Sequence, residues 1–384
     1  MLHIKSSLVS VTWLSENINA ENLIVLDATI PKVNGSILDN SSGYIPKSQF
    51  FDLKKKFSNT NAEFPNTIPN KTQFETEARL LGITNKSAIV VYDQHGLYSS
   101  ARAWWLFKYF GHQNIAVLDG GLPEWIAKNL PTVRDYSYPK LNGNFKTNEQ
   151  TELIANFEVI QSFSKAPEVQ ILDARSSKRF NGETPEPRNG LRSGTIPNSL
   201  NLPFTELLNG NKLKSEVELK SIFDNLVLQH QKLVFSCGSG ITACNLALAA
   251  SVSGYKNLVV YDGSWTEYGT LTKNIMDTPN WTKDELIAYT LLYAAHSDFN
   301  ENNHERNVII SKVDMQTFQK IHDEFSKDND YQSIQKILAS VEQHNYSKSG
   351  IEQMLADIKG LFFSDGNFDI REHSMLLFLK RILK

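Results

Sequence analysis

The 384-residue sequence lacks the features that would direct it to a membrane, a nucleic acid or a secretory route. No stretch approaches the roughly 18 apolar residues that a membrane-spanning helix needs. We expect no signal peptide, because residues 1–7 lack a charged region followed by a long apolar stretch. The formal net charge is −3, and no polybasic stripe is present to neutralise nucleic-acid phosphates. These absences predict a soluble, cytoplasmic protein that binds neither membranes nor nucleic acid.

Cysteine is scarce, and its placement excludes a disulfide framework. The two cysteines, Cys237 and Cys244, fall on a predicted loop and on the first turn of the next helix, which is poor placement for a relaxed disulfide. We expect Cys244 to be a small core residue on that helix. His95 and His112 lie in polar loops without a second ligand at zinc-like spacing. We therefore expect neither a metal nor a bound cofactor.

Most of the chain is an internal duplication. Four segments recur in the same order, at offsets between 143 and 151 residues: 25–28 with 171–174, 43–46 with 194–197, 89–93 with 233–237, and 111–120 with 254–263. Each copy alternates short β-branched runs with helical patterns, which predicts an α/β fold with a parallel sheet flanked by helices. We expect two such domains, residues 1–140 and 151–282, with the polar stretch 136–150 as the linker.

The second copy carries Cys237 where a predicted strand meets a predicted helix. The apolar run 233–234 precedes the cysteine, and an alanine-rich helical segment, 246–252, follows the loop. Gly238 and Gly240 let consecutive backbone N–H groups point inward, and the helix N-terminus adds partial positive charge. Such an environment stabilises a reactive thiolate. The alternative, a buried structural cysteine, does not explain glycines at alternate positions directly after the thiol.

The loop 237–242, Cys-Gly-Ser-Gly-Ile-Thr, resembles the active-site loop of 3-mercaptopyruvate sulfurtransferases, and the duplication resembles the tandem domains of their rhodanese superfamily. In thiosulfate-specific rhodaneses basic residues usually follow the cysteine. Gly238 and Ser239 stand there in this chain, so the resemblance favours mercaptopyruvate. It implies that Cys237 takes sulfur from 3-mercaptopyruvate, that pyruvate leaves as its enolate, and that the cysteine persulfide passes sulfur to a thiol, thioredoxin or cyanide. The persulfide is then the only intermediate group, and no cofactor is implied.

The resemblance also implies roles for the other loop residues. The backbone N–H groups of the loop, from Gly238 to Thr242, would stabilise the anionic sulfur in the manner of an oxyanion hole, and Gly238, Gly240 and Ile241 would bind the substrate. The hydroxyls of Ser239 and Thr242 would act in catalysis as further donors beside the cysteine. The plain alternative for both hydroxyls is capping of the loop and the helix, and we expect Thr242 to do both.

Two arginines of the second copy are predicted to bind the substrate carboxylate and ketone. Arg179 and Arg188 are nine residues apart, with the same spacing and context as the substrate-binding arginine pair of mercaptopyruvate sulfurtransferases. The planar guanidinium fork matches a carboxylate. Either arginine taken alone would be read as a solvated surface charge. We expect Arg175 instead to tie the end of its strand to neighbouring Asp or Glu residues.

The first copy has lost the reactive cysteine. The position equivalent to Cys237 is Asp93, and a carboxylate cannot carry transferable sulfur. As in other inactive copies of this family, the first domain is therefore expected to be non-catalytic and to supply one wall of the cleft.

The first copy also departs from the family at two further positions. Mercaptopyruvate sulfurtransferases commonly place an aspartate and a histidine there, which form a proposed proton relay with the loop serine. Lys54 and Asn66 stand at these positions, so a relay through Ser239 loses its base. The proton for the leaving enolate must come from water, Lys54 or elsewhere. Lys54 either attracts an anionic donor or is a solvated member of the lysine run 54–56.

Residues 283–384 form a third predicted domain, which is helical, because apolar residues recur at helical spacing and β-branched runs are absent. Segments 297–300 and 364–367, each followed by a glutamate, repeat an acidic loop that resembles those of TerB-like tellurite-resistance domains. They do not match a calcium EF-hand, because Asn303 and Ile370 occupy the glycine position. We expect the acidic loops to cap helices and the domain to dock a protein partner or govern assembly.

Three functions are consistent with the sequence. The first is transfer of sulfur from 3-mercaptopyruvate, and the second is a thiosulfate:cyanide sulfurtransferase on the same fold. The third is a non-catalytic sulfur carrier or stress-response binding module. A cysteine phosphatase is disfavoured, because only four residues separate Cys237 from Thr242 and the phosphate-binding arginine at the loop end is absent.

Overall fold

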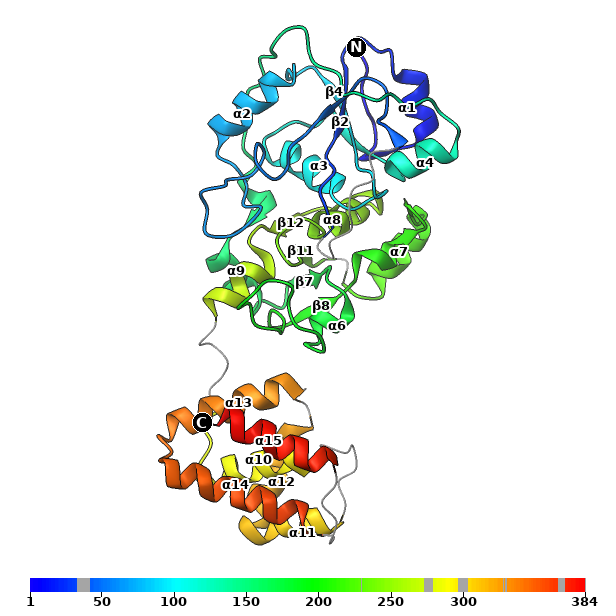
Figure 1. Cartoon of the computed structure of the whole chain (residues 1–384). Coiled ribbons are helices and arrows are strands. Elements are labelled where there is room, and N and C mark those ends of the chain that lie inside the picture. The colour runs from blue at the N-terminus through cyan, green and yellow to red at the C-terminus, as the bar shows by residue number, and fades with distance from the viewer. Residues whose placement is uncertain are drawn as a thin grey trace. The chain divides into compact units, whose positions relative to one another are not determined.

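The polypeptide folds into two compact units. The computed structural model describes residues 1–32, 42–228, 230–272, 279–295, 303–326, 328, 330–364 and 370–383. The first unit comprises Met1–Phe180 and Thr184–Leu271, and the second comprises Asn181–Glu183 and Thr272–Lys384 (Figure 1). The first unit holds both α/β copies, and the second is helical.

The first copy is a five-stranded parallel sheet in the order β1-β5-β4-β2-β3. Its central strand, β4, is buried at every position, which explains why its sequence Ala-Ile-Val-Val-Tyr is apolar throughout and does not alternate. The strands are β1 (Leu8–Val9), β2 (Leu23–Asp27), β3 (Ser48–Phe50), β4 (Ala88–Tyr92) and β5 (Ile115–Leu118), and the helices are α1 (Val11–Asn17), α2 (Lys71–Leu80), α3 (Ser100–Tyr109) and α4 (Gly121–Ala127).

The second copy repeats this topology strand for strand, in the order β6-β12-β11-β7-β8, and all of its pairs are parallel. The predicted duplication of an α/β fold is thereby confirmed. Its strands are β6 (Ile154–Ala155), β7 (Val169–Asp173), β8 (Ser199–Asn201), β11 (Lys232–Ser236) and β12 (Leu258–Tyr261), with the hairpin β9 (Leu208–Asn209) and β10 (Lys212–Leu213). Its helices are η2 (Thr151–Leu153), α5 (Phe157–Phe163), α6 (Ser177–Phe180), η3 (Phe204–Leu207), α7 (Glu216–Asp224), α8 (Ala243–Val252) and α9 (Ser264–Leu271).

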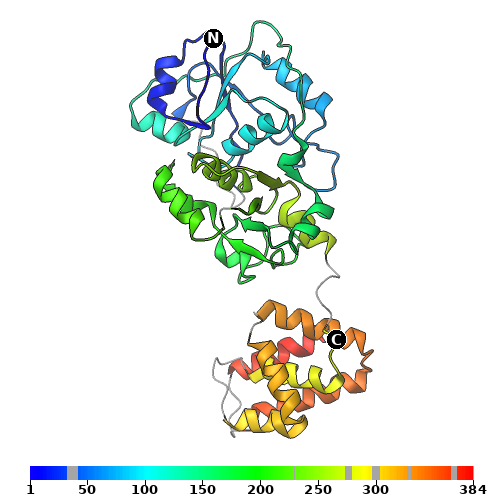
Figure 2. The ribbon, with the colours of Figure 1, turned by 180° about the vertical axis from the view of Figure 1, so that it is seen from behind.

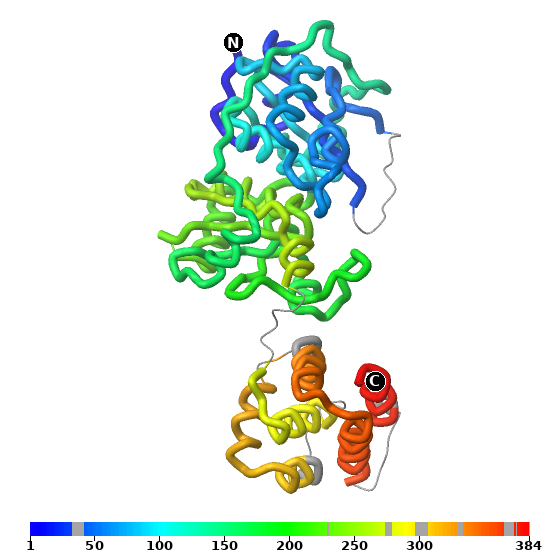
Figure 3. The backbone as a smooth tube through the Cα atoms, turned by 90° about the vertical axis from the view of Figure 1, so that its left-hand side faces the viewer, coloured from blue at the N-terminus to red at the C-terminus, as the bar shows by residue number. Residues whose placement is uncertain are grey.

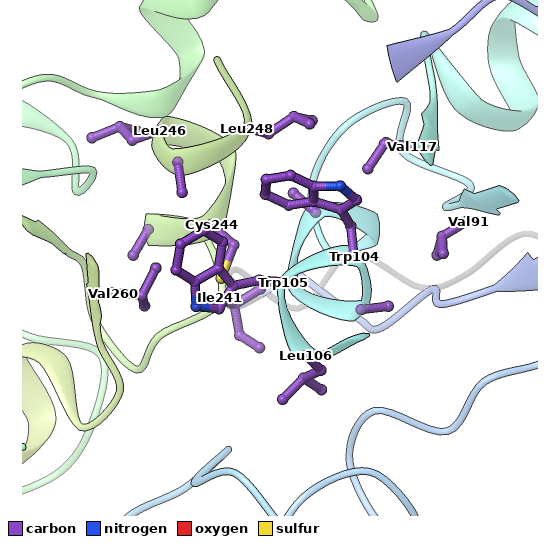
Figure 4. Close-up of a cluster of buried hydrophobic side chains, with 14 of the residues drawn as sticks. Val91, Trp104, Trp105, Leu106, Val117, Ile241, Cys244, Leu246, Leu248 and Val260 are labelled. Carbon is purple, nitrogen blue, oxygen red and sulfur yellow. The ribbon is translucent and has the colours of Figure 1, made fainter. Parts of the chain in front are cut away.

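The two sheets share one apolar core through helices α3 and α8, which pack against each other. Helix α8 is buried along almost its whole length, so its alanine-rich composition suits close packing on both sides. Trp105 lies beside Ile241 and Cys244, and Trp104 lies between Val117 and Leu248 (Figure 4). Cys244 is thus the small core residue that the sequence predicts. This shared core holds the two copies in a fixed relation.

The linker 136–150 contains no regular element and runs over the surface of the first domain before it enters the second (Figure 3). It is tied down by backbone hydrogen bonds, from Gly143 N–H to the Arg79 carbonyl and from Asn148 N–H to the Phe110 carbonyl. Phe145 is fully buried in the first core. The linker is therefore held against the surface of the first domain.

The second unit is a bundle of helices, and no strand occurs in its described residues (Figure 2). Helix α10 forms its centre, because it contacts every other helix of the bundle and is buried on all sides. This explains its nearly continuous apolar sequence. The helices are α10 (Lys283–Ala295), α11 (Asn303–Lys312), α12 (Met315–Phe325), α13 (Asp330–Gln343), α14 (Lys348–Phe362) and α15 (Ile370–Ile382).

The predicted TerB-like loops lie almost entirely outside the described residues, which leave out 296–302 and 365–369. The resemblance to TerB-like domains therefore stays a prediction. Elsewhere in this unit Asp314 and Ser347 cap helices α12 and α14 through their side chains. Across the described parts of the chain, no helix combines the length and apolar character that crossing a bilayer requires.

Candidate functional site

A cavity of about 280 Å³ lies at the carboxyl end of β11, and residues of both α/β copies line it. The carboxyl ends of parallel strands are where such folds bind ligands, because the loops that leave the strands converge there. The first copy contributes Lys32, Lys54, Asn66 and Tyr98, and the second contributes Arg175, Arg179, Arg188, Phe204, Cys237, Gly238, Ser239, Ile241 and Thr242. The structure thus brings together all but one of the predicted site residues, the exception being Gly240.

Cys237 directly follows β11, with a relative exposure of 2%. Its backbone N–H and that of Gly240 both donate to Ser264 Oγ, at 3.1 Å each. Ser264 Oγ in turn donates to the Tyr261 carbonyl at 2.8 Å and lies 3.9 Å from Cys237 Sγ. The Ser264 hydroxyl therefore holds the cysteine loop in place from its buried side. Sequence reasoning missed Ser264, since nothing nearby in the chain links it to the cysteine.

Gly240 differs from its expected role. Its N–H is taken by Ser264 Oγ, so it does not face the sulfur. Its φ of +75° is in the left-handed region, and a Cβ there would lie 2.6 Å from the Asp262 carbonyl oxygen. Both facts require glycine at this position. Gly240 serves the shape of the loop, and it is not a substrate-binding donor.

Four amide groups of the loop remain open to a ligand. Among the described residues, no acceptor pairs with the N–H of Gly238, Ser239, Ile241 or Thr242. The N-terminus of α8 begins at the next residue and adds partial positive charge. The loop is thus suited to an anion, as the sequence predicts.

Thr242 occupies the N-cap position of α8, but its hydroxyl does not cap the helix. The prediction that it caps the helix is wrong for a local reason. Its backbone is helical, with φ −75° and ψ −15°, whereas a capping side chain needs the extended conformation to reach back to the helix. The side chain lines the cavity instead.

Arg179 and Arg188 both extend over the cysteine loop. A Cβ placed on Gly238 would lie 3.1 Å from Arg179 Nη2 and 3.6 Å from Arg188 Nη1. The residue after the cysteine therefore needs to be small for both guanidinium groups to approach. Partial burial lowers the pKa of Arg188, and the nearby charge of Arg179 acts in the same direction.

Glu186 orients one of these arginines. Its side chain is fully buried and forms ion pairs with Arg179 at 2.5 Å and with Arg175 at 2.8 Å. Arg175 also pairs with Asp173 at 2.7 Å, so it ties the strand end to acidic neighbours as predicted. Within the described chain, no carboxylate forms an ion pair with Arg188, Lys54 or Lys32. The cavity wall therefore carries unneutralised positive charge.

A hydrogen-bonded chain enters the cavity from the first domain. Lys54 Nζ donates to Asn66 Oδ1 at 2.8 Å, and Asn66 Nδ2 donates to Ser239 Oγ at 2.8 Å. Arg188 Nη2 also donates to Ser239 Oγ, at 3.0 Å. Asn66 has φ +63°, a left-handed conformation that asparagine tolerates better than most residues. Lys54 is therefore part of the site and not only a solvated member of a lysine run.

Arg102 of α3 links the two α/β copies next to the hydrogen bonds that connect Lys54 to Ser239. It has a relative exposure of 1% and pairs with Asp262 at 2.5 Å. It also donates to the Asn66 carbonyl at 2.8 Å and to the Gly240 carbonyl at 3.4 Å. The sequence signal for it is a single charge within the apolar segment 101–107, because a charge on a buried helix face needs a partner.

The equivalent loop of the first copy holds its own anion. Asp93 Oδ2 accepts the backbone N–H groups of Tyr98, Ser99 and Ser100 at 2.9 Å each, and its Oδ1 accepts the His95 N–H. The carboxylate thus fills the loop that in the second copy stays open. The described residues hold no group of three His, Cys, Asp or Glu side chains placed to bind a metal ion.

Comparison with known proteins identifies relatives of both α/β copies. A family model described as a rhodanese-like domain matches residues 10–128 and 157–270. Mouse 3-mercaptopyruvate sulfurtransferase is 37% identical over 273 residues, which cover 68% of this chain and 91% of the relative. Mouse thiosulfate sulfurtransferase is 34% identical over 273 residues, with the same coverage.

A solved structure matches the same fold. The crystal structure of the 3-mercaptopyruvate sulfotransferase SseA from Escherichia coli has 31% sequence identity and a TM-score of 0.62. The match covers 68% of this chain and 99% of that one. The rhodanese-like matches end at residue 270, before helix α10 begins.

Proposed function

The chain belongs to the rhodanese family and is a sulfurtransferase, and we propose that it takes sulfur from 3-mercaptopyruvate onto Cys237. The observation that carries this proposal is the position of Arg179 and Arg188 over Gly238, the residue after the cysteine. Two guanidinium groups at this point suit a small α-keto acid, whose carboxylate accepts paired hydrogen bonds. A bulky or basic residue at 238 would fill the space that the arginines use.

The proposed first step moves one sulfur atom. The Cys237 thiolate attacks the thiol sulfur of 3-mercaptopyruvate, so an S–S bond forms and the C–S bond breaks. The electron pair of the C–S bond becomes the enolate of pyruvate, which then takes up a proton. The open N–H groups of Gly238, Ser239, Ile241 and Thr242 stabilise the negative charge on sulfur, in the manner of an oxyanion hole.

The second step returns the cysteine to its starting state. An incoming thiolate attacks the outer sulfur of the persulfide, which forms a new persulfide on the acceptor and releases the Cys237 thiolate. We propose a small thiol or thioredoxin as the acceptor, with cyanide as a substitute in assays. Because Cys237 lines a cavity formed by both α/β copies, the acceptor must reach the persulfide through that cavity.

Thiosulfate is the second candidate donor, and the charge of the cavity favours it. Lys32, Lys54 and Arg188 line the cavity without carboxylate partners in the described chain, and thiosulfate carries two negative charges. Mouse thiosulfate sulfurtransferase is also among the relatives, at 34% identity. Against it, Gly238 and Ser239 leave no basic side chain within the loop itself.

Steady-state kinetics test the proposal. Pyruvate and sulfide release from 3-mercaptopyruvate with a reducing thiol is compared with thiocyanate formation from thiosulfate and cyanide. We expect the larger kcat/KM with mercaptopyruvate, and we expect Cys237→Ser to lower kcat by more than about 10³. The matched control is Cys244→Ser, which changes the same atom in the apolar core and leaves the loop cysteine in place. A larger kcat/KM with thiosulfate would overturn the choice of donor.

A further inference from the structure

The direction of each hydrogen bond along the chain from Lys54 to Ser239 is fixed by its first member. An ammonium group has only donors, so Lys54 Nζ must face an acceptor. The side-chain amide of Asn66 therefore presents its oxygen to Lys54, at 2.8 Å, and its nitrogen to Ser239. The amide orientation, which is often ambiguous for asparagine, has one solution here.

Within the described residues, the proton of the Ser239 hydroxyl is then the one hydrogen-bonding group of this side chain that is left for a ligand. Its Oγ accepts from Asn66 Nδ2 at 2.8 Å and from Arg188 Nη2 at 3.0 Å, and a hydroxyl has two acceptor positions and one proton. Both partners are donors, so neither can take the Ser239 proton. Among the described residues no other acceptor receives it. Because Ser239 lines the cavity, its O–H is available to a ligand there.

We propose that Lys54 and Asn66 are positioning residues that hold the Ser239 O–H as a fixed donor to the ketone oxygen of the sulfur donor. This inference rests on the proposed function. When the C–S bond breaks, the ketone oxygen becomes the enolate oxygen, and a preorganised donor aimed at developing charge stabilises that transition state. Ser239 keeps its proton and donates a hydrogen bond, because its side-chain partners in the described part of the chain, Asn66 and Arg188, are both donors.

The inference predicts different effects for the two sulfur donors, 3-mercaptopyruvate and thiosulfate. Thiosulfate has no ketone, and no enolate forms when its S–S bond breaks. Loss of the Ser239 donor should therefore act on kcat with mercaptopyruvate far more than on kcat with thiosulfate. A purely structural role of Lys54 or Asn66 would lower both turnover numbers alike.

Asn66→Asp is the most informative variant, because it keeps the shape of the side chain and reverses the direction of the hydrogen bond between residue 66 and Ser239. A carboxylate accepts from both Lys54 and Ser239, so the Ser239 O–H turns away from the cavity. We expect the ratio of kcat for mercaptopyruvate to kcat for thiosulfate to fall about 10²-fold, as for loss of one oxyanion donor. The added negative charge should raise KM for both anionic donors. Lys54→Met should lower the same ratio about tenfold, because Asn66 is then free to rotate.

Lys55→Met is the matched control, since Lys55 is the next lysine of the same run and makes no side-chain contact with Asn66. It should leave the ratio within about twofold. Should thiosulfate turnover be too slow to measure, the rate of Cys237 alkylation by iodoacetamide serves as the reference. An unchanged ratio in Asn66→Asp, or equal losses with both reactions, overturns the inference. A wild-type protein without mercaptopyruvate turnover instead overturns the proposed function on which it rests.

Discussion

Ser264 illustrates how one buried side chain fixes the conformation of the cysteine loop. Its hydroxyl satisfies the N–H groups of Cys237 and Gly240 and keeps its own proton for the Tyr261 carbonyl. Its φ of +50° is unusual for serine and brings the side chain under the loop. The loop is therefore shaped from below, while its upper face stays open to an anion.

Ser264→Ala should loosen the loop, because it leaves two buried N–H groups without an acceptor. The cost is about 1–3 kcal/mol per unsatisfied group, so the thermal midpoint of the α/β part should fall. We also expect a lower kcat, since the cysteine is less well fixed. Calorimetry and steady-state kinetics measure both effects. Ser253→Ala is the control, because that hydroxyl only donates within its own helix, and an equal loss there would contradict this account.

Lys54 gives the site a dependence on pH. Partial burial lowers the pKa of its ammonium below the ordinary 10.5, and the charge of Arg188 acts in the same direction. Lys32, Arg175 and Arg179 also line the cavity, and none of them favours a further positive charge. The ammonium exists below its pKa and is lost as the pH rises through it, so the hold on Asn66 weakens on the alkaline side.

We therefore expect kcat with mercaptopyruvate to fall as pH rises, with a limb that begins below 10.5. Lys54→Arg should move this limb to higher pH, because a guanidinium stays protonated above about pH 12. The profile is measured as kcat against pH at saturating donor. A limb that is identical in wild type and Lys54→Arg would assign it to another group.

The sequence placed Cys237, Arg179 and Arg188 in one site, and it predicted the structural role of Arg175, because each lies in a recognisable local context. It did not predict the hydrogen bonds that connect Lys54 to Ser239 through Asn66. Those residues are far apart in sequence, and only the folded contact between two domains brings Asn66 to Ser239. The capping role of Thr242 was also wrong, because the backbone conformation at the end of the loop is not encoded in residue type.

Helix α3 is the element through which the first copy contacts the cysteine loop of the second copy. It packs on α8, and its Arg102 reaches Asp262 and the carbonyls of Asn66 and Gly240. Burial alone would lower the pKa of Arg102, but the charges and hydrogen bonds of Asp262 and Cys244 together raise it above its ordinary value. One side chain thus holds both the cysteine loop and the turn that carries Asn66.

Arg102→Met should destabilise the α/β part strongly, because it leaves Asp262 buried without its counter-charge. Breaking a buried pair costs about 3–5 kcal/mol, and the double variant with Asp262→Asn should recover part of the loss. Thermal midpoints of the single and double variants measure this coupling. Lys56→Met removes an ion pair with Glu77 in which Lys56 is 55% exposed, and it should cost no more than about 1 kcal/mol. A similar loss in both single variants would show that Arg102 has no special role.

At the scale of elements, the strands were the most predictable part. Both sheets have the same strand order, and each pair of repeated segments lies on or just before a matching pair of strands. The anchoring of the linker was not predictable, since its contacts to Arg79 and Phe110 are made by backbone groups that any sequence carries. Side chains anchor the linker as well, because Phe145 is buried and the hydroxyls of Tyr136 and Thr147 donate to Asp27 and Glu75.

At the scale of the whole molecule, the cavity and the helical region belong to different compact units. Every residue that lines the cavity belongs to the first unit, and the helical unit has an apolar core of its own. The partner or assembly role expected for residues 283–384 stays a prediction, as does their resemblance to TerB-like domains. The family match supports the sulfurtransferase part alone.

A chain of residues 1–282 should therefore keep the activity. We expect its kcat with mercaptopyruvate to lie within about twofold of that of the full chain, because domains with separate cores fold independently. Kinetics and the thermal transition of the shortened chain provide the measurement. If the shortened chain is folded but inactive, the helical unit must contribute to catalysis.

The most direct test of the central claim is the mass of the protein after exposure to 3-mercaptopyruvate without an acceptor. A gain of one sulfur atom, located at Cys237 by peptide mapping and matched by one equivalent of pyruvate, is the predicted result. The gain should persist in Cys244→Ser and vanish in Cys237→Ser. Pyruvate release without added sulfur, or sulfur located on Cys244, would contradict the account.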